Sequence, residues 1–138
     1  MNLTDIREIK ALLARHGFRF SKSMGQNFLI ADWVPRDIAD AAGLDKGCAV
    51  LEIGPGIGPL TVELSRRAGK VAAVELDRAL LPILAEMLAD CPNVEVIPGD
   101  VMKLDLGLLA AERFPGLPVR ACANLPYNIT TPVFTKLL

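Results

Sequence analysis

The sequence is poor in cysteine and in aromatic residues. Its three cysteines have no Cys-x-x-Cys spacing and no neighbouring histidine cluster, so neither a zinc site nor a disulfide framework is expected. We therefore predict no metal site. We interpret Cys48, Cys91 and Cys122 as small interior side chains of a protein in a reducing compartment, the cytoplasm.

The sequence also has no long apolar run. No stretch reaches the roughly 18 apolar residues that a membrane span requires, so no contact with a membrane is predicted. The amino-terminal residues mix charged with apolar side chains, which is unlike a signal peptide. The 11 glycines and 10 prolines amount to about 15% of 138 residues, below the share of about 25–30% that marks low-complexity chains. These features indicate a single globular domain.

Charge is unevenly distributed along the chain, although the net charge is only −1. Residues 1–30 hold five basic and two acidic side chains, whereas residues 31–138 hold ten basic and fourteen acidic ones. Such a basic arm suits contact with a polyanion, and it equally suits an ordinary solvated helix face. Charge alone leaves both interpretations open.

Strands and helices are expected to alternate from residue 48 onwards. Before that point, apolar periodicity predicts helices over 4–16 and 32–42, with the only histidine, His16, in an exposed capping position. Pro82 fits poorly inside the helix expected after Asp77, so that helix should start late or irregularly. The other predicted elements are strands at 48–53, 70–76, 94–97 and 119–123 and helices at 59–68 and after Thr131.

This alternation predicts an α/β fold of the Rossmann-like type. Its parallel sheet should have the strand order 3-2-1-4, with helices on both faces. Ligands bind such sheets at the carboxyl ends of the strands, beside the point where the order reverses.

The motif Glu52-Ile-Gly-Pro-Gly-Ile-Gly58 directly follows the first strand. Glycines there allow a sharp turn and a close approach of a ligand to the backbone. The dinucleotide fingerprint would need glycine at position 59, where this chain has Pro59, which weakens an NAD-binding interpretation. The structural alternative is a tight turn that binds nothing.

Two acidic residues follow the next two predicted strands. Glu75 lies 21 residues beyond Gly54, a spacing that suits hydrogen bonds to the hydroxyls of a ribose. Asp100 follows the third strand and suits a bond from an adenine amino group, although Gly-Asp is also a common turn pair. For Glu75 the alternative is a capping or salt-bridging surface acid.

Five segments together closely resemble the ribosomal RNA adenine dimethyltransferases, over residues from about 17 to 138. The segments are GQNFL (25–29), EIGPGIG (52–58), VELD (74–77), GD (99–100) and NLPYN (124–128). The resemblance implies S-adenosylmethionine as cofactor, contacted by Asn27, Leu29, Gly54, Glu75, Asp100 and Asn124. It also implies dimethylation of N6 on two adjacent adenines near the 3′ end of small-subunit rRNA, in a pre-ribosomal small subunit during ribosome biogenesis.

The resemblance assigns the chemistry to Asn124, Leu125, Pro126 and Tyr127. The Asn124 side-chain oxygen and the Leu125 carbonyl accept the N6 hydrogens, and Pro126 stiffens their turn. Tyr127 offers a flat face to the target base, and stacking of this kind is worth about 1–3 kcal/mol. Lys22 and Arg19 are candidates for contact with RNA phosphate.

The part of the family that the chain resembles also implies how its domains are organised. Residues 1–45 would form a helical extension with a cofactor-covering loop, and residues 46–138 a methyltransferase core that stops after strand 4, without the helical C-terminal domain of the family. Such a piece is expected to bind cofactor but not to methylate RNA. It is also expected to self-associate through the exposed edge of strand 4.

Two other classes of function stay open at this stage. One is a different adenine-N6 nucleic-acid methyltransferase, although those usually have proline where this chain has Leu125. The other is a non-catalytic nucleotide-binding module.

Overall fold

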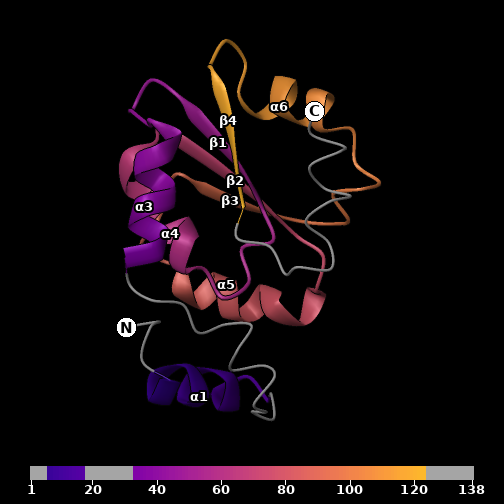
Figure 1. The fold of residues 1–138 in the computed structure, drawn as a ribbon. Helices are drawn as coiled ribbons and strands as arrows, with labels where there is room; N and C mark the ends of the chain where they lie inside the picture. Colours follow the sequence, from indigo (N-terminus) through magenta and orange to yellow (C-terminus); the bar gives the residue numbers. More distant parts are fainter. Residues whose placement is uncertain (1–5, 18–32, 124–138) are drawn as a thin grey trace.

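The fold is a parallel sheet between helices, seen in a computed structural model that describes residues 6–17 and 33–123 (Figure 1). The sheet has four parallel strands in the order β3-β2-β1-β4, which confirms the predicted order. Its strands are β1 (Ala49–Ile53), β2 (Lys70–Glu75), β3 (Val94–Pro98) and β4 (Val119–Ala123). The helices are α1 (Ile6–Arg15), α3 (Trp33–Ala42), α4 (Pro59–Arg67), the short 3₁₀ helix η1 (Arg78–Leu80), α5 (Leu81–Met87) and α6 (Leu106–Arg113).

Helices cover both faces of the sheet, as predicted. Alternate residues of a strand point to opposite faces. In β1, Val50 packs with α3 and α4 against one face, while Leu51 packs toward α6 on the other. Figure 1 shows α3 and α4 on one side of the sheet and α6 on the other. All five residues of β1 are buried, which explains why this strand reads as a continuous apolar run rather than an alternating one.

The helix after β2 starts irregularly, as expected from Pro82. The Asp77 side chain accepts a hydrogen bond from Ala79 N at 3.0 Å and caps the 3₁₀ turn η1, and α5 begins only at Leu81. Pro82 thereby falls in the first turn of α5, where its missing N–H leaves no helical hydrogen bond unmade.

Helix α6 has no counterpart among the elements expected from the sequence pattern. It is only eight residues long, and Gly107 lies near its start. The Asp105 side chain caps it by accepting from Leu108 N at 3.0 Å. A two-turn helix of this kind carries too short an apolar stripe for periodicity to detect, and its place is set by packing on the sheet.

Two of the three cysteines lie where the sequence analysis placed them. Cys48 and Cys122 are buried in the core between the sheet and α3 and α4, whereas Cys91 is only half-buried. All three are free thiols. Within the described residues, no helix is long and apolar enough to cross a membrane.

Strand register sets the geometry of the candidate site. Ile53, the last residue of β1, pairs with Val74 on one side and with Ala123 on the other. Glu75 at the end of β2 pairs with Pro98 at the end of β3. The four strands therefore end at nearly the same level, and the described loops that follow β1, β2 and β3 begin at the same edge of the sheet.

Candidate functional site

The glycine loop between β1 and α4 has a backbone that favours glycine at three positions. Gly54, Gly56 and Gly58 have φ values of 67°, 63° and 99°. An L side chain rarely adopts such angles, so the three glycines let the chain turn directly from strand to helix. Gly54 N donates to Val74 O at 2.9 Å, which continues the pairing of β1 with β2 by one residue.

Both oxygens of the Glu75 carboxylate accept backbone hydrogen bonds. Gly56 N donates to Oε1 at 3.0 Å, and Asp77 N donates to Oε2 at 2.9 Å. The side chain is 6% exposed, and this burial raises its pKa, while the bonds from Asp77 and Gly56 act in the opposite direction. The structure thus places Glu75 in contact with the loop that contains Gly54, at the carboxyl ends of β1 and β2.

Glu75 keeps acceptor capacity beyond these two bonds. A carboxylate offers about four lone-pair positions, and the backbone donors take one on each oxygen. The remaining positions suit the two adjacent hydroxyls of a ribose. Glu75 is therefore a bridge between loops and a candidate acceptor for a ligand.

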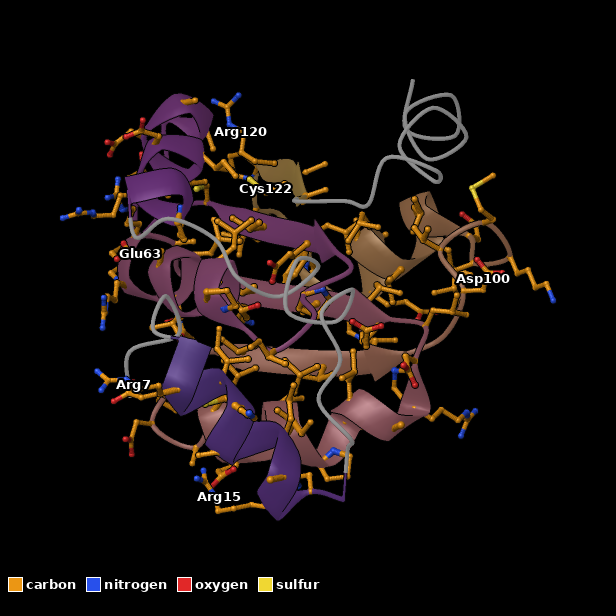
Figure 2. The ribbon with its side chains drawn as sticks, turned by 60° about the horizontal axis from the view of Figure 1, so that its bottom comes forward. Arg7, Arg15, Glu63, Asp100, Arg120 and Cys122 are labelled. Carbon is orange, nitrogen blue, oxygen red and sulfur yellow. The ribbon has the colours of Figure 1, made fainter. Side chains whose placement is uncertain are left out.

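Asp100 lies at the same end of the sheet (Figure 2). Its Oδ1 accepts from Met102 N at 2.9 Å, so the turn role that sequence reasoning weighed as the alternative is present. Gly99 N, next to it, donates to the Glu75 carbonyl oxygen at 2.9 Å and holds this turn beside the end of β2. Asp100 is half-buried, and as a carboxylate it has further acceptor positions for a ligand.

Glu52 is a buried acid within the glycine motif, and no separate role is predicted for it from the sequence. It is 1% exposed, and the Thr61 hydroxyl of α4 donates a hydrogen bond to its Oε1. Burial raises the pKa of Glu52 to about 8, against the lowering effect of Thr61 and with a further increase from Glu75. The signal in the sequence is an acid inside the apolar run of residues 48–53, because such a group needs a buried partner.

Leu76 was also missed as a candidate ligand contact. It lies between Glu75 and Asp77 at the end of β2, and it is 65% exposed. A large exposed apolar side chain beside polar acceptors suits a ligand that has a flat aromatic ring next to hydroxyl groups.

His16 lies at the end of α1, but its role differs from the expected exposed cap. Its Nε2 is in hydrogen-bond contact with Glu86 Oε2 of α5 at 2.8 Å, and the side chain is only 22% exposed. Arg15 contacts the other oxygen of Glu86. These contacts join the end of α1 to α5, and they explain why His16 is not an exposed cap.

Six predicted site residues lie outside the described part of the chain. They are Asn27, Leu29, Asn124, Leu125, Pro126 and Tyr127. The two basic residues proposed for RNA contact, Arg19 and Lys22, also lie outside the described part of the chain. In the described ranges 6–17 and 33–123, no group of three or more His, Cys, Asp or Glu side chains could hold a metal ion.

A doubly wound parallel sheet of order 3-2-1-4, with a glycine loop and acids at its strand ends, defines a Rossmann-like nucleotide-binding fold of the kind found in methyltransferases. The ribosomal RNA adenine dimethylase family matches residues 17–138, and the chain belongs to this family.

Relatives and solved structures agree with this assignment. The chain is 49% identical over 136 residues to ribosomal RNA small subunit methyltransferase A of Alkaliphilus oremlandii, covering 99% of this chain and 47% of that protein. It is 53% identical over 130 residues to the protein of the same name from Geobacillus thermodenitrificans, covering 94% and 44%. The chain therefore spans about half the length of the curated relatives that it matches.

Two solved structures share the fold at 33% identity. The 23S rRNA methyltransferase ErmE superposes with a TM-score of 0.65, over 77% of this chain and 40% of that one. A dimethyladenosine transferase from Plasmodium falciparum superposes with a TM-score of 0.60, over 75% of this chain and 35% of that one.

We predict that Glu52 makes the protein less stable as the pH rises toward 8. Its pKa is about 8 in the folded chain and near 4.5 when exposed, so between these values the folded state holds a proton that the unfolded state has lost. Raising the pH through this window therefore favours unfolding, at about 1.4 kcal/mol per unit of pKa difference. Burial also raises the pKa of Glu75, so this residue should likewise make the free energy of unfolding fall as the pH rises.

Glu52→Gln tests this prediction, since glutamine stays neutral and still accepts from Thr61. Urea unfolding of both proteins from pH 5 to pH 8 should show the variant gaining free energy of unfolding relative to wild type as the pH rises. Glu95→Gln is the control, since Glu95 is a half-exposed acid of β3 that pairs with Arg113. This variant should show the same decrease in free energy of unfolding with rising pH as the wild type. Parallel pH profiles for wild type and Glu52→Gln would contradict the prediction.

Proposed function

We propose that the chain is part of the catalytic domain of an S-adenosylmethionine-dependent rRNA adenine-N6 dimethyltransferase. The substrate is a pair of adjacent adenines near the 3′ end of small-subunit rRNA, within a pre-ribosomal small subunit in the cytoplasm. The observation that carries the proposal is the Glu75 carboxylate, which reaches from the end of β2 to the glycine loop and still has acceptor positions for a ribose.

The cofactor would extend across the carboxyl ends of β1, β2 and β3. Gly54 would lie at its methionine end, where the absence of a side chain permits close approach. Glu75 would accept from the ribose hydroxyls, and Asp100 would accept from the adenine amino group. Leu76, exposed between these acids, would contact the adenine ring. Asn27, Leu29 and Asn124 complete the set of proposed cofactor contacts.

The methyl-transfer step needs positioning rather than a strong base. The lone pair of adenine N6 is delocalised into the ring, so the site must draw this nitrogen toward tetrahedral geometry. The Asn124 side-chain oxygen and the Leu125 carbonyl would accept its two hydrogens, on a turn stiffened by Pro126. Fixed acceptors of this kind supply rate by orienting the nucleophile before reaction. Tyr127 would stack on the target base once it has left its helical stack, a displacement that costs a few kcal/mol.

Glu75→Ala should weaken binding of S-adenosylhomocysteine by about tenfold or more, because it removes the ribose acceptor and releases the backbone donors of Gly56 and Asp77. Calorimetric titration of this chain measures the change. Glu95→Ala, which removes an acid near the amino end of β3 and so away from the carboxyl ends of the strands, should bind as wild type does. A wild-type chain that binds NAD and not S-adenosylhomocysteine would reject the methyltransferase proposal in favour of a nucleotide-binding module.

Tyr127→Phe and Tyr127→Ala should differ in their activity of methyl transfer to small-subunit particles. The assay needs the protein at the full length of its relatives. The phenylalanine variant should keep much of the activity because stacking uses the ring, whereas the alanine variant should lose it. Asn124→Ala should abolish transfer yet leave thermal stability near that of wild type. Equal loss in the phenylalanine and alanine variants would overturn the stacking role.

The 138-residue chain by itself should bind cofactor without methylating RNA, and should self-associate through β4. Among the described residues, β4 pairs only with β1, and the side chains of Val119, Arg120 and Ala121 are exposed. Unpaired strand edges join to other edges unless charge or covering elements prevent it. Sedimentation velocity should show association that rises with concentration and that Ala121→Lys reduces. A monomer at every concentration would contradict the association, and methylation by this chain would contradict the expected inactivity.

A further inference from the structure

Helix α1 depends on tertiary packing for its existence. It has ten residues, and an isolated helix of this length is marginal in water. Three of its apolar side chains, Ile9, Leu12 and Leu13, are nevertheless 0% exposed. The surface that buries them therefore decides whether α1 forms, and where it lies.

That surface includes the glycine loop itself. Ile9, Leu12 and Leu13 form one buried cluster with Ile57 of the loop and with Leu80 and Ile83, with Met87 packed against it. Ile57 is 1% exposed and lies between Gly56 and Gly58, both at positive φ. Its side chain is thus an apolar anchor in the most glycine-rich turn of the chain.

The loop is held from two directions. On the side of the sheet, the Glu75 carboxylate accepts from Gly56 N. On the other side, Ile57 enters the cluster made by α1, η1 and α5. A Cβ atom built on Gly58 would lie 3.5 Å from Leu84 and 3.8 Å from Met87, so α5 also packs closely against the end of the loop. With three glycines, the loop backbone has many accessible conformations, and these contacts select one of them.

A second set of contacts fastens the end of α1 to α5. Arg15 Nη2 lies 3.0 Å from Glu86 Oε1, and His16 Nε2 lies 2.8 Å from Glu86 Oε2 (Figure 2 labels Arg15). The hydrogen bonds from His16 and then Arg15 hold the pKa of Glu86 below its ordinary value. Both partners come from the last residues of the α1 segment, so one glutamate defines how that end of the helix docks.

We propose that α1 is a positioning element for the glycine loop: through Ile57 it holds the loop in the shape that binds the cofactor, so that docking of α1 and binding of cofactor strengthen one another. The inference rests on the proposed cofactor site. It assigns Leu12, Leu13 and Glu86 as positioning residues that act on the ligand through Ile57. Coupling between two such events is reciprocal and typically reaches about 5–150-fold in affinity.

Leu12→Ala is the first test, because it opens a cavity between α1 and the loop without changing the loop itself. The dissociation constant of S-adenosylhomocysteine, measured by calorimetry on this chain, should rise by about fivefold or more. Leu64→Ala is the matched control: Leu64 is also 0% exposed, but it packs in the cluster between α3, α4 and the sheet. It should lower stability to urea while the dissociation constant stays within about twofold of wild type.

Glu86→Gln is a milder second variant, for use where a cavity prevents folding. It removes the negative charge that Arg15 and His16 both contact, and it should weaken binding to a smaller extent than Leu12→Ala. Glu63→Gln is its control, since Glu63 also contacts two arginines, Arg66 and Arg67, but on α4. This control should bind S-adenosylhomocysteine as wild type does.

The reciprocal measurement follows α1 directly. Saturating S-adenosylhomocysteine should slow tryptic cleavage after Lys10, within α1, because coupling of the two events means that bound ligand strengthens the docking of α1. Wild-type affinity in both Leu12→Ala and Glu86→Gln, with α1 loosened in the cleavage assay, would overturn the inference and leave α1 a merely structural helix. A wild-type chain that does not bind S-adenosylhomocysteine would instead reject the proposed function on which the inference rests.

Discussion

The carboxylate of Glu75 joins the parts of this molecule that have to stay together. One oxygen holds Gly56 in the loop after β1, and the other holds Asp77 at the start of the 3₁₀ turn after β2. Hydrogen bonds to charged groups contribute about 1.5–3 kcal/mol each. Without this group, the two adjacent loops would lose the hydrogen bonds that join them through a single side chain.

This arrangement places two acidic groups where burial disfavours their charged form. Glu52 is the last residue but one of β1, and Glu75 is the last residue of the neighbouring strand β2. Both are nearly inaccessible to solvent, and each has a raised pKa. Hydroxyl and backbone donors, from Thr61 in one case and from Gly56 and Asp77 in the other, replace the water that the acids have lost. The polar interior at the strand ends is thus built from hydrogen bonds rather than from ion pairs with cations.

Local signals in the sequence were enough to predict the sheet and to select the glycine loop and Glu75 as candidate site residues. The glycines at 54, 56 and 58 and the acid at 75 are each recognisable within a few residues of a strand end, and strand order followed from the alternation of elements. The partners of Glu52 and Ile57 were not predictable in the same way. Thr61 meets Glu52 only because of how α4 turns onto the sheet.

The packing partners of α1 were also not predictable from the sequence. Its apolar stripe was visible in the sequence, but its partner surface is made from residues more than 40 positions away. Helix α6 was missed because two turns with a glycine give too weak a period. Asn27, Leu29 and the segment from Asn124 to Tyr127 remain predictions, since they lie outside the described residues.

The four strands differ in how deeply they are buried, and this divides the site into two parts of unequal stability. Every residue of β1 is buried, as are five of the six in β2, whereas β3 has no buried residue and β4 has one. Amide hydrogens exchange with solvent fastest where local opening costs least, which here means the two outer strands. The glycine loop and Glu75 therefore adjoin the two strands that should exchange most slowly. Asp100, in contrast, follows a strand that should open more readily, so one side of the candidate site should relax while the other keeps its shape.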